Sequence, residues 1–488
     1  MGLCASAAPV KPDAPPPVAK NYYAQQAAKK AERQRGSREW ASWDSHRGLA
    51  HVVHGFAMAT ATSSKSRARD AVLEAYAAMD KRLALPTRGE KGATVMHDVT
   101  ADILFVFASP EYSAAAISDA LVECAPSVPI HGCSSSQGVF GWDGLYLTTS
   151  EDGSRTSGGI AIMGIADDEG TYATNAQGFD NHESVETAAI TAARACQSKL
   201  KTGVDLSAAF ITCSAGTADR VIKAVRTVLG NVPLVGGSAG VGVDGFSSQF
   251  SELDSFTSGG VVISLMQSTA TVESRIVWPY EATDSTGVAT KVLTTTPSKG
   301  ASVCLLHEID GKRACDIFAS WCEESVRSDP IWGEGKEGDI RALSASNPMR
   351  VTPTGTEESF TVECLRKNSD GSLTLSAPID EGCQLKGQRH VDPSEERIAR
   401  KKTSQAVVTD ILSEVATAGA LIVFSDEYRR FTTGEIKSIQ RHVNGKDSNM
   451  PYCGMFAGQQ ISSIKSESDC VGVNSLAVQI TLFKKKEK

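Results

Sequence analysis

Small polar residues and glycines gather in two regions of this chain where their types could bind a ligand. The two sets are Ser109, Cys133, Ser134 and Ser135, and Cys213, Ser214, Gly237 and Ser238. Each set follows apolar runs typical of buried strands, and ligands of α/β proteins bind just beyond the ends of such strands. Glycines there let backbone N–H groups approach a carboxylate closely. We predict ligand-binding turns, with tight turns filled by small residues as the alternative.

A cysteine and a histidine in the first region could also act together. His131 and Cys133 alternate along one predicted strand and therefore face the same side of it. A catalytic thiol needs a lowered pKa and a partner that orients its base. The sequence supplies neither, so we favour a buried structural cysteine. A hydrolase or transferase that uses Cys133 or Cys213 is the enzymatic alternative to a non-catalytic protein.

The spacing of glycines, histidines and cysteines argues against cofactor sites. Gly240 to Gly245 spells G-x-G-x-x-G, which in a dinucleotide site is followed directly by a helix whose N-terminus holds the pyrophosphate. Residues 246–250 predict a turn and a strand instead. The nine histidines and twelve cysteines show no metal-ligand spacing. We therefore expect neither a cofactor nor a metal.

The first residues match an acylation pattern. Met1 to Ser6 fits M-G-x-x-x-[ST], which predicts myristoylation of Gly2, and Cys4 is placed for palmitoylation. Two acyl chains hold a protein stably to a bilayer, whereas one holds it only marginally. Residues 1–70 also carry 11 Lys and Arg against 5 Asp and Glu, a balance that favours anionic lipid. We predict a disordered basic tail over 1–69 that anchors the protein to the cytoplasmic side of the plasma or ciliary membrane. The alternative is an ordinary cytoplasmic N-terminus.

Composition sets the protein class. The chain has 488 residues, of which 41% are hydrophobic and 22% charged, as in soluble globular proteins with more than one domain. The net charge of −8 argues against nucleic acid as a partner. No apolar run is long enough to span a bilayer, and the N-terminus lacks the apolar core of a signal peptide. The scattered cysteines indicate reduced thiols in the cytosol.

The elements that must position these residues occur as a repeat. A predicted strand, a helix, a Val-Pro and a second strand with a glycine precede Thr-Ser-Gly-Gly at 156–159 and again at 257–260. Pro129 and Pro233 lie 104 residues apart, which is too long for a solenoid period and suits duplication of a half-domain. We predict copies over 95–180 and 206–278, joined by a helix near 183–200.

The C-terminal half contains a third, diverged copy. Its predicted strands are 421–424, 450–455 and 475–480, and a helical pattern with Val407, Val408, Ile411, Leu412 and Val415 precedes them. Gly454 stands in the glycine turn of this copy. Arg429 follows its first strand and could clamp a carboxylate or remain solvated. Strands at 303–306 and 360–365, with turns at Asp310-Gly311 and Asp370-Gly371, come before it.

The order of these motifs over residues 70–485 resembles a tandem FIST domain, with N-terminal and C-terminal halves. The N-terminal half matches in Phe107-Ala108-Ser109-Pro110, Gly132-Cys133-Ser134 and Pro233 to Gly240, and the C-terminal half in Leu305 to Lys312, Asp380-Glu381-Gly382, Val423-Phe424-Ser425 and Gly454-Met455-Phe456. The resemblance implies a FIST N-terminal domain at 70–280, a linker at 281–299 and a FIST C-terminal domain at 300–485. The expected fold is mixed α/β, with repeated β-α-β-β-β units whose mixed sheets are flanked by helices.

The resemblance also implies a function. It implies an intracellular ligand-sensing module, in bacteria often attached to signalling outputs, with amino acids as suggested ligands. In animals the domain occurs in an F-box protein, where it recognises protein. Where the family commonly has Gly-Glu-Ile, this chain has Gln137-Gly138-Val139 and Gln459-Gln460-Ile461. We expect a non-catalytic, membrane-anchored sensor that binds a small molecule or a partner protein, with a substrate adaptor that lacks its own F-box as the alternative.

Overall fold

A unit of two parallel strands and one antiparallel strand occurs three times in the computed structural model. The structure describes residues 37–38, 49–53, 55–88, 94–148, 158–242, 245–277, 280–390, 418–426, 451–462, 472–474 and 478–485. The parallel pairs are β6 (Ile103–Ala108) with β7 (Ile130–Ser134), β12 (Ala208–Cys213) with β13 (Leu234–Ser238), and β27 (Ala418–Asp426) with β28 (Tyr452–Ala457). The antiparallel strands are β10 (Ile160–Asp167), β16 (Gly260–Gln267) and β31 (Val478–Lys485). The predicted third copy is therefore confirmed.

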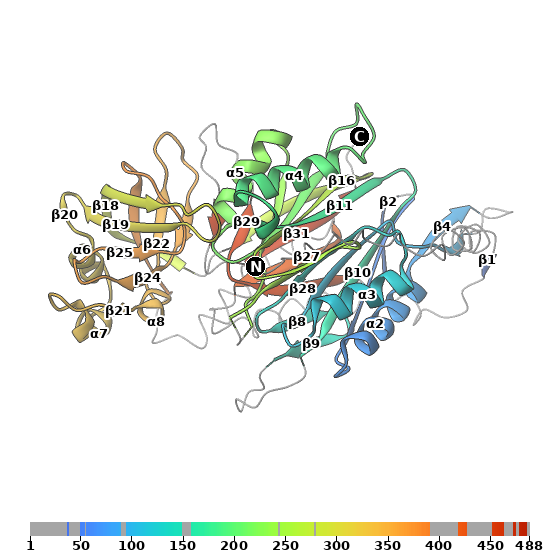
Figure 1. The fold of residues 1–488 in the computed structure, drawn as a ribbon, viewed down its shortest axis with the longest axis horizontal. Coiled ribbons are helices and arrows are strands. Elements are labelled where there is room, and N and C mark those ends of the chain that lie inside the picture. The colour runs from blue at the N-terminus through green and yellow to red at the C-terminus, as the bar shows by residue number, and fades with distance from the viewer. Residues whose placement is uncertain are drawn as a thin grey trace, which may run out of the picture.

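Each copy lends a hairpin to the sheet of another copy. The hairpins are β8 (Gly138–Gly141) with β9 (Gly144–Leu147), β14 (Ser248–Phe250) with β15 (Ser255–Thr257), and β29 (Gln460–Ser462) with β30 (Gly472–Asn474). The hairpin of copy one pairs with β28, that of copy two with β7, and that of copy three with β13. The three sheets are thus closed by a cyclic exchange, and the copies form one body rather than separate halves (Figure 1).

A glycine in each second strand pairs with the exchanged hairpin, and in copies one and three it makes room for an aromatic ring of that hairpin. Gly132 pairs with Phe250, Gly454 with Phe140, and Gly236 with Ile461. A Cβ at Gly132 would overlap the ring of Phe250, and a Cβ at Gly454 would overlap that of Phe140. The glycines of the repeated motif therefore mark where one copy receives another.

The repeat boundaries differ from those predicted. β3 (Phe56–Ser63), β11 (Thr171–Gly178) and β17 (Ala270–Val277) pair with β10, β16 and β31 respectively. β11 and β17 therefore belong to the sheets of copies two and three, not to the copies at 95–180 and 206–278 in which we placed them. β3 is fully buried, so the fold extends into the segment predicted as a disordered tail over 1–69, and β2 (Leu49–Val53) pairs beside it.

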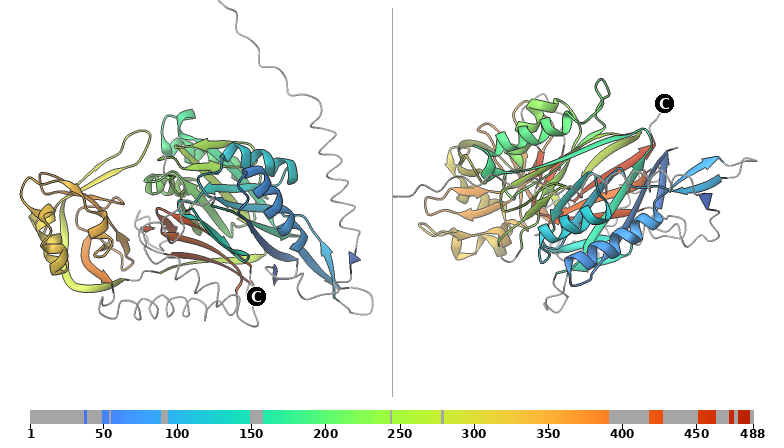
Figure 2. Two further views of the ribbon diagram at one scale, coloured as in Figure 1. Left: turned by 90° about the horizontal axis from the view of Figure 1, so that it is seen from below. Right: turned by 45° about the vertical axis from the view of Figure 1, so that its right-hand side comes forward.

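Helices cover the outer faces of the first two sheets. The helices are α2 (Ala68–Arg82) and α3 (Ala114–Cys124) on copy one, and α4 (Val185–Gln197) and α5 (Ala218–Leu229) on copy two. Alternate residues of β6 divide between this outer layer, with Leu104 and Val106, and an inner core, with Phe105 and Phe107. The inner faces of all three sheets contribute to that core. The mixed α/β fold is confirmed (Figure 2).

A separate β domain is inserted between β17 and β27. It comprises β18 (Tyr280–Thr295), β19 (Val303–Ile309), β20 (Lys312–Arg313), α6 (Ala314–Trp321), α7 (Glu324–Arg327), β21 (Gly338–Asp339), α8 (Arg341–Ser344), β22 (Met349–Thr352), β23 (Phe360–Val362), β24 (Cys364–Lys367), β25 (Leu373–Leu375) and β26 (Gln384–His390). Figure 1 shows it in yellow and orange at one end of the molecule. The predicted linker at 281–299 is wrong, because most of it lies in β18. The predicted domain at 300–485 divides between this insertion and copy three.

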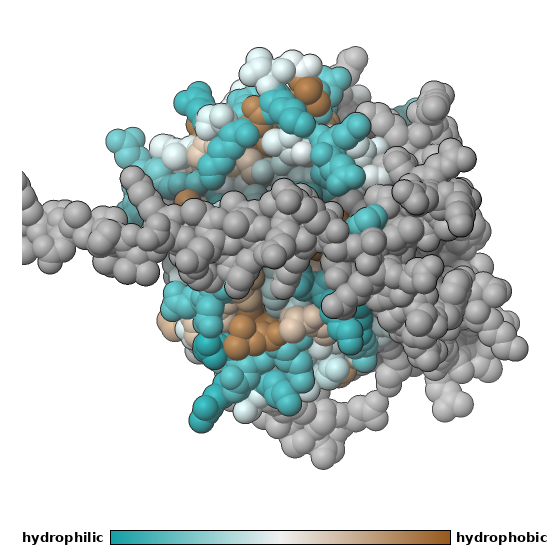
Figure 3. Space-filling view, turned by 90° about the vertical axis from the view of Figure 1, so that its right-hand side faces the viewer, coloured by the Kyte–Doolittle hydropathy of each residue, from teal (hydrophilic) through white to brown (hydrophobic). Residues whose placement is uncertain are grey.

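The opposite end carries a small sheet of β1 (Ser37–Arg38), β5 (Thr94–Asp98) and β4 (Ala84–Arg88). On this side of the molecule the described residues are mostly hydrophilic, with a small apolar patch (Figure 3). None of the helices in the described ranges is long and apolar enough to cross a bilayer. Gly2, Cys4, Arg429 and the helical pattern at 407–415 lie outside the described residues.

A histidine lies inside the shared core. His131 has no exposed surface, and its Nδ1 lies 2.8 Å from Ser264 Oγ, which in turn is 2.7 Å from Thr174 Oγ1. The rings of Phe105 and Phe210 pack beside it, at centroid distances of 5.6 and 6.3 Å. Burial without a counter-charge lowers the pKa of His131 to about 3.

We predict that His131 makes the fold sensitive to acid. As pH falls below the ordinary histidine pKa of about 6.5, the unfolded chain takes up a proton that the folded chain excludes down to about pH 3. His131 therefore lowers the free energy of unfolding by up to about 1.4 kcal/mol per pH unit in this window. In His131→Phe, the free energy of unfolding measured with urea should fall less steeply than in the wild type as the pH is lowered from neutral to acid. If the free energy of unfolding of His131→Phe depends on pH as strongly as that of the wild type, the prediction is wrong.

Candidate ligand-binding pocket

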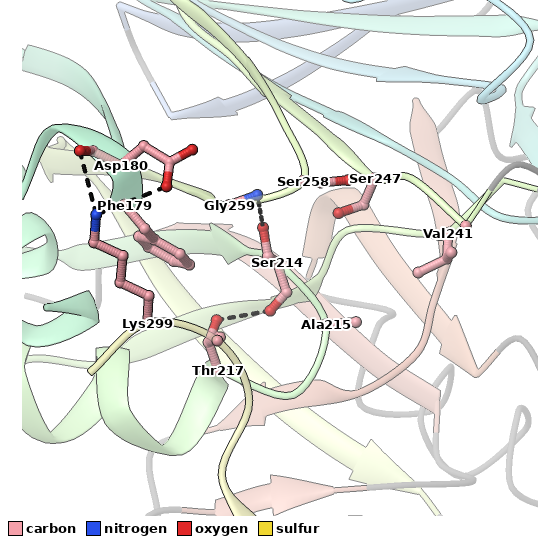
Figure 4. A pocket seen from close by; sticks show the side chains of 12 residues that line it. Phe179, Asp180, Ser214, Ala215, Thr217, Val241, Ser247, Ser258, Gly259 and Lys299 are labelled. Carbon is pink, nitrogen blue, oxygen red and sulfur yellow. Dashed lines mark hydrogen bonds and ion pairs between the residues drawn. The ribbon is translucent and has the colours of Figure 1, made fainter. Parts of the chain in front are cut away.

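A pocket of about 230 Å³ lies at the C-terminal end of β12. It is lined by Phe179, Asp180, Ser214, Ala215, Thr217, Val241, Gly245, Ser247, Ser258, Gly259, Lys299 and Gly300. These residues come from five connections: β11–α4, β12–α5, β13–β14, β15–β16 and the β18–β19 loop of the inserted domain (Figure 4). Its place beyond the end of a parallel strand is where α/β sheets bind ligands.

Ser214 holds the pocket floor together. Its Oγ accepts hydrogen bonds from the backbone N–H groups of Gly259 and Gly260, both at 3.0 Å. Thr217 Oγ1 donates to the carbonyl of Ser214 at 2.7 Å. Ser214 therefore fixes the backbone of the second Thr-Ser-Gly-Gly, whose Gly259 and Gly260 N–H groups are used in this contact.

Opposite charges stand at the pocket wall. Lys299 Nζ lies 3.8 Å from Asp180 Oδ1 and donates to the Asp180 carbonyl at 3.4 Å. The side chains are 44% and 94% exposed, so this pair contributes little to stability. Both groups can therefore turn to a ligand at low cost. Lys299 suits a carboxylate and Asp180 an ammonium group.

Copy one shows why the pocket occurs in copy two. Tyr112 and Thr217 occupy the same position, because their backbone N–H groups bond to the carbonyls of Ser109 and Ser214, three residues earlier in each case. Tyr112 is 6% exposed, and its hydroxyl donates to the Lys65 carbonyl at 2.5 Å. The tyrosine ring fills space in copy one that the smaller threonine leaves open in copy two.

Most of the residues predicted to bind a ligand make structural contacts instead. Ser109 Oγ accepts the Gly159 N–H at 2.7 Å, the counterpart of the Ser214 contacts. Ser134 Oγ donates to the Gly240 carbonyl at 2.7 Å and accepts the Ser248 N–H at 2.8 Å. The two Ser134 contacts join copy one to copy two, whereas the Ser109 contact lies within copy one.

The other turn residues join the remaining copies. Ser135 Oγ accepts the Phe456 N–H at 2.8 Å, and Ser238 Oγ donates to Gln459 Oε1 at 3.3 Å. Gly237 faces the Gln459 carbonyl, where a Cβ would lie 2.6 Å from the oxygen. Gly454 receives Phe140, as described above. The structure thus brings only Ser214, among the predicted residues it describes, into the pocket.

The two cysteines considered as nucleophiles are fully buried. Cys133 Sγ lies 3.3 Å from Met455 Sδ, and no hydrogen bond joins it to His131 among the described contacts. Burial raises the pKa of both Cys133 and Cys213, in the latter to about 12. A nucleophilic thiol needs the opposite shift. Within the described ranges no three potential ligands gather around a metal position.

Sequence reasoning missed Asp180, Thr217 and Lys299. Lys299 stood in the presumed linker, and Asp180 lies in a short turn, η3 (Phe179–Asn181), without a motif. Thr217 could have been found by aligning the copies, because Ser-x-x-Tyr in copy one becomes Ser-x-x-Thr in copy two.

One comparison with known proteins gives a match. Residues 102–312 match the family model described as the FIST N domain. The matched range runs from β6 to β20 and so includes the pocket, whereas copy three lies outside it. No curated protein sequence matches the chain.

We predict that Ser109 and Ser214 stabilise their copies to a similar degree. Replacing either by alanine removes the acceptor of buried N–H groups, which costs about 1–3 kcal/mol. Urea unfolding of Ser109→Ala and Ser214→Ala should show this loss, while the exposed Ser198→Ala should lose less than about 0.5 kcal/mol. Wild-type stability in both variants would show that these serines are free for another role.

Proposed function

We propose that this chain is a FIST-domain protein, matched to the family over residues 102–312, and that its second repeat senses a small amino-acid-like ligand. The FIST domain is a sensor domain of signal transduction, so a sensory role follows from the family. The pocket beside Ser214 supports the finer proposal, because two opposite charges meet at its wall.

The charged pair carries the proposal. A zwitterion with its carboxylate on Lys299 and its ammonium on Asp180 replaces one ion pair by two, and Lys299 is the less exposed of the two protein groups. The N–H groups of Gly259 and Gly260 are bonded to Ser214 Oγ, so they fix the pocket and leave the charged pair to hold the ligand. The volume of about 230 Å³ is below the usual range of drug-sized sites and fits a ligand of a few heavy atoms.

We predict that an L-amino acid raises the melting temperature of the full chain. Ligand at a hundred times its Kd adds about 2.7 kcal/mol to stability, so a panel of the protein L-amino acids should give a concentration-dependent shift for at least one member. Thr217→Tyr installs the residue that fills copy one and should abolish the shift. Thr227→Tyr, at an exposed position of the same helix, should retain it.

A flat response across the panel in the wild-type chain would overturn the amino-acid proposal. It would favour protein recognition, for which a stoichiometric partner in a pull-down is the evidence. The enzymatic alternative is disfavoured by the buried, high-pKa thiols, and unusually fast labelling of Cys133 or Cys213 at neutral pH would revive it.

We also propose a lipid anchor at the N-terminus, which rests on sequence alone. Gly2→Ala removes the myristoylation acceptor and should move the protein from the membrane pellet to the soluble fraction when it is expressed in eukaryotic cells. Gly36→Ala, in the same tail, should leave the distribution unchanged. Persistence of Gly2→Ala in the pellet contradicts the anchor.

A further inference from the structure

A buried arginine stands directly behind the pocket wall. Arg220, the third residue of α5, is 5% exposed. Its Nε and Nη2 donate to the two carboxylate oxygens of Glu186 at 2.6 and 2.5 Å. Its remaining N–H groups donate to the carbonyls of Pro297, Ser298 and Gly300, at 2.6, 3.1 and 3.0 Å. All five guanidinium donors therefore have a partner.

The three carbonyls belong to the loop between β18 and β19. This loop, residues 296–302, is the end of the inserted domain that reaches copy two, and it brings Lys299 and Gly300 to the pocket. Further bonds hold it: Val185 N–H donates to the Ser298 carbonyl, and Ser302 N–H donates to the Gly216 carbonyl. The pocket wall is thus supplied by one domain and fixed by the other.

Because Arg220 is buried, its hydrogen bonds to the 296–302 loop must form or break together. A guanidinium out of water must satisfy its donors, and each unpaired buried donor costs free energy. If the loop left, three donors of Arg220 would lose their acceptors at once, so Arg220 would have to become solvated. A lysine has three donors from one point and cannot match one carboxylate and three carbonyls.

The first copy offers an internal comparison. Arg220 stands six residues after Ser214, and the residue six positions after Ser109 in copy one is Ala115. The segment between β11 and β12 contains only η3 and α4, whereas the inserted domain lies at the corresponding place after copy two, between β17 and β27. The arginine therefore accompanies the loop and is no general requirement of the repeat.

We propose that Arg220 is a positioning residue that latches the 296–302 loop over the pocket, so that seating of the inserted domain and closure of the pocket are one event. The inference rests on the proposed function for what the pocket binds, but the latch itself can be tested without a ligand. A ligand that binds better to the closed pocket then stabilises the inserted domain in its seated position. The two states of the sensor are the closed pocket with the domain seated and the open pocket with the loop displaced.

The test places a cysteine inside the pocket of the full-length chain. Ser247 lines the pocket and is 4% exposed. In Ser247→Cys, alkylation of residue 247 by iodoacetamide, followed by peptide mass spectrometry, reports how often the pocket opens. Adding Arg220→Lys or Glu186→Gln should accelerate this alkylation by about tenfold or more. Arg194→Lys, at an exposed position of α4, is the matched control and should leave the rate unchanged.

Native cysteines separate latch opening from general loosening. Cys133 and Cys453 lie in the shared core with no exposed surface. If Arg220 is a latch, alkylation in the variants is faster at residue 247 alone. If both variants also show faster alkylation of Cys133 and Cys453, Arg220 only stabilises the fold and the proposal is overturned. An unchanged rate at residue 247 in both variants also overturns it. If Arg220→Lys fails to fold, the half-exposed Glu186→Gln decides by the same criteria.

The result is independent of whether an amino acid binds. If the panel of amino acids gives no thermal shift but the alkylation rates differ as expected, the latch stands and the proposed ligand is wrong. If a panel member binds and the rates do not differ, the ligand stands and the latch is wrong.

Discussion

The structure depends on the hydrogen bonds that close the outer edge of each parallel strand pair. β7, β13 and β28 would each expose a row of N–H and C=O groups, which is a liability for any sheet. The chain satisfies each edge with a hairpin from another copy, and Gly132, Gly237 and Gly454 leave room for the approaching segment. Because the exchange is cyclic, no copy can close its own sheet.

Function is constrained by the same exchange. The joints between copies are made by the polar residues that follow the second strands, such as Ser134, Ser135 and Ser238. In an isolated α/β unit these positions would be open to a ligand. Here they are occupied by neighbouring copies, and the described pocket lies instead beyond the first strand of copy two, where Thr217 stands in place of a tyrosine.

The sequence predicted the elements that depend on local pattern. The strand pairs of all three copies, α3, α5 and the Asp310-Gly311 turn follow from apolar runs and turn residues, and the structure contains them. The domain boundaries, β3 and the site were not predictable in the same way. Each depends on pairing between segments distant in sequence: β3 meets β10, and the pocket needs Lys299 from another domain to reach Ser214.

The three copies show how a duplicated scaffold acquires a specialised site. Copy one fills the position beyond its first strand with Tyr112, and copy three has Tyr428 at the same spacing after Ser425 in the sequence. Copy two has a threonine there, and it has Arg220 six residues after Ser214, where copy one has Ala115 six residues after Ser109. The first change opens a cavity and the second recruits a loop from the inserted domain to close it. Thr217 without Arg220 would leave the pocket without the loop that closes it. Arg220 without Thr217 would hold that loop over a site filled by a tyrosine. The two residues therefore act together to form one closed pocket.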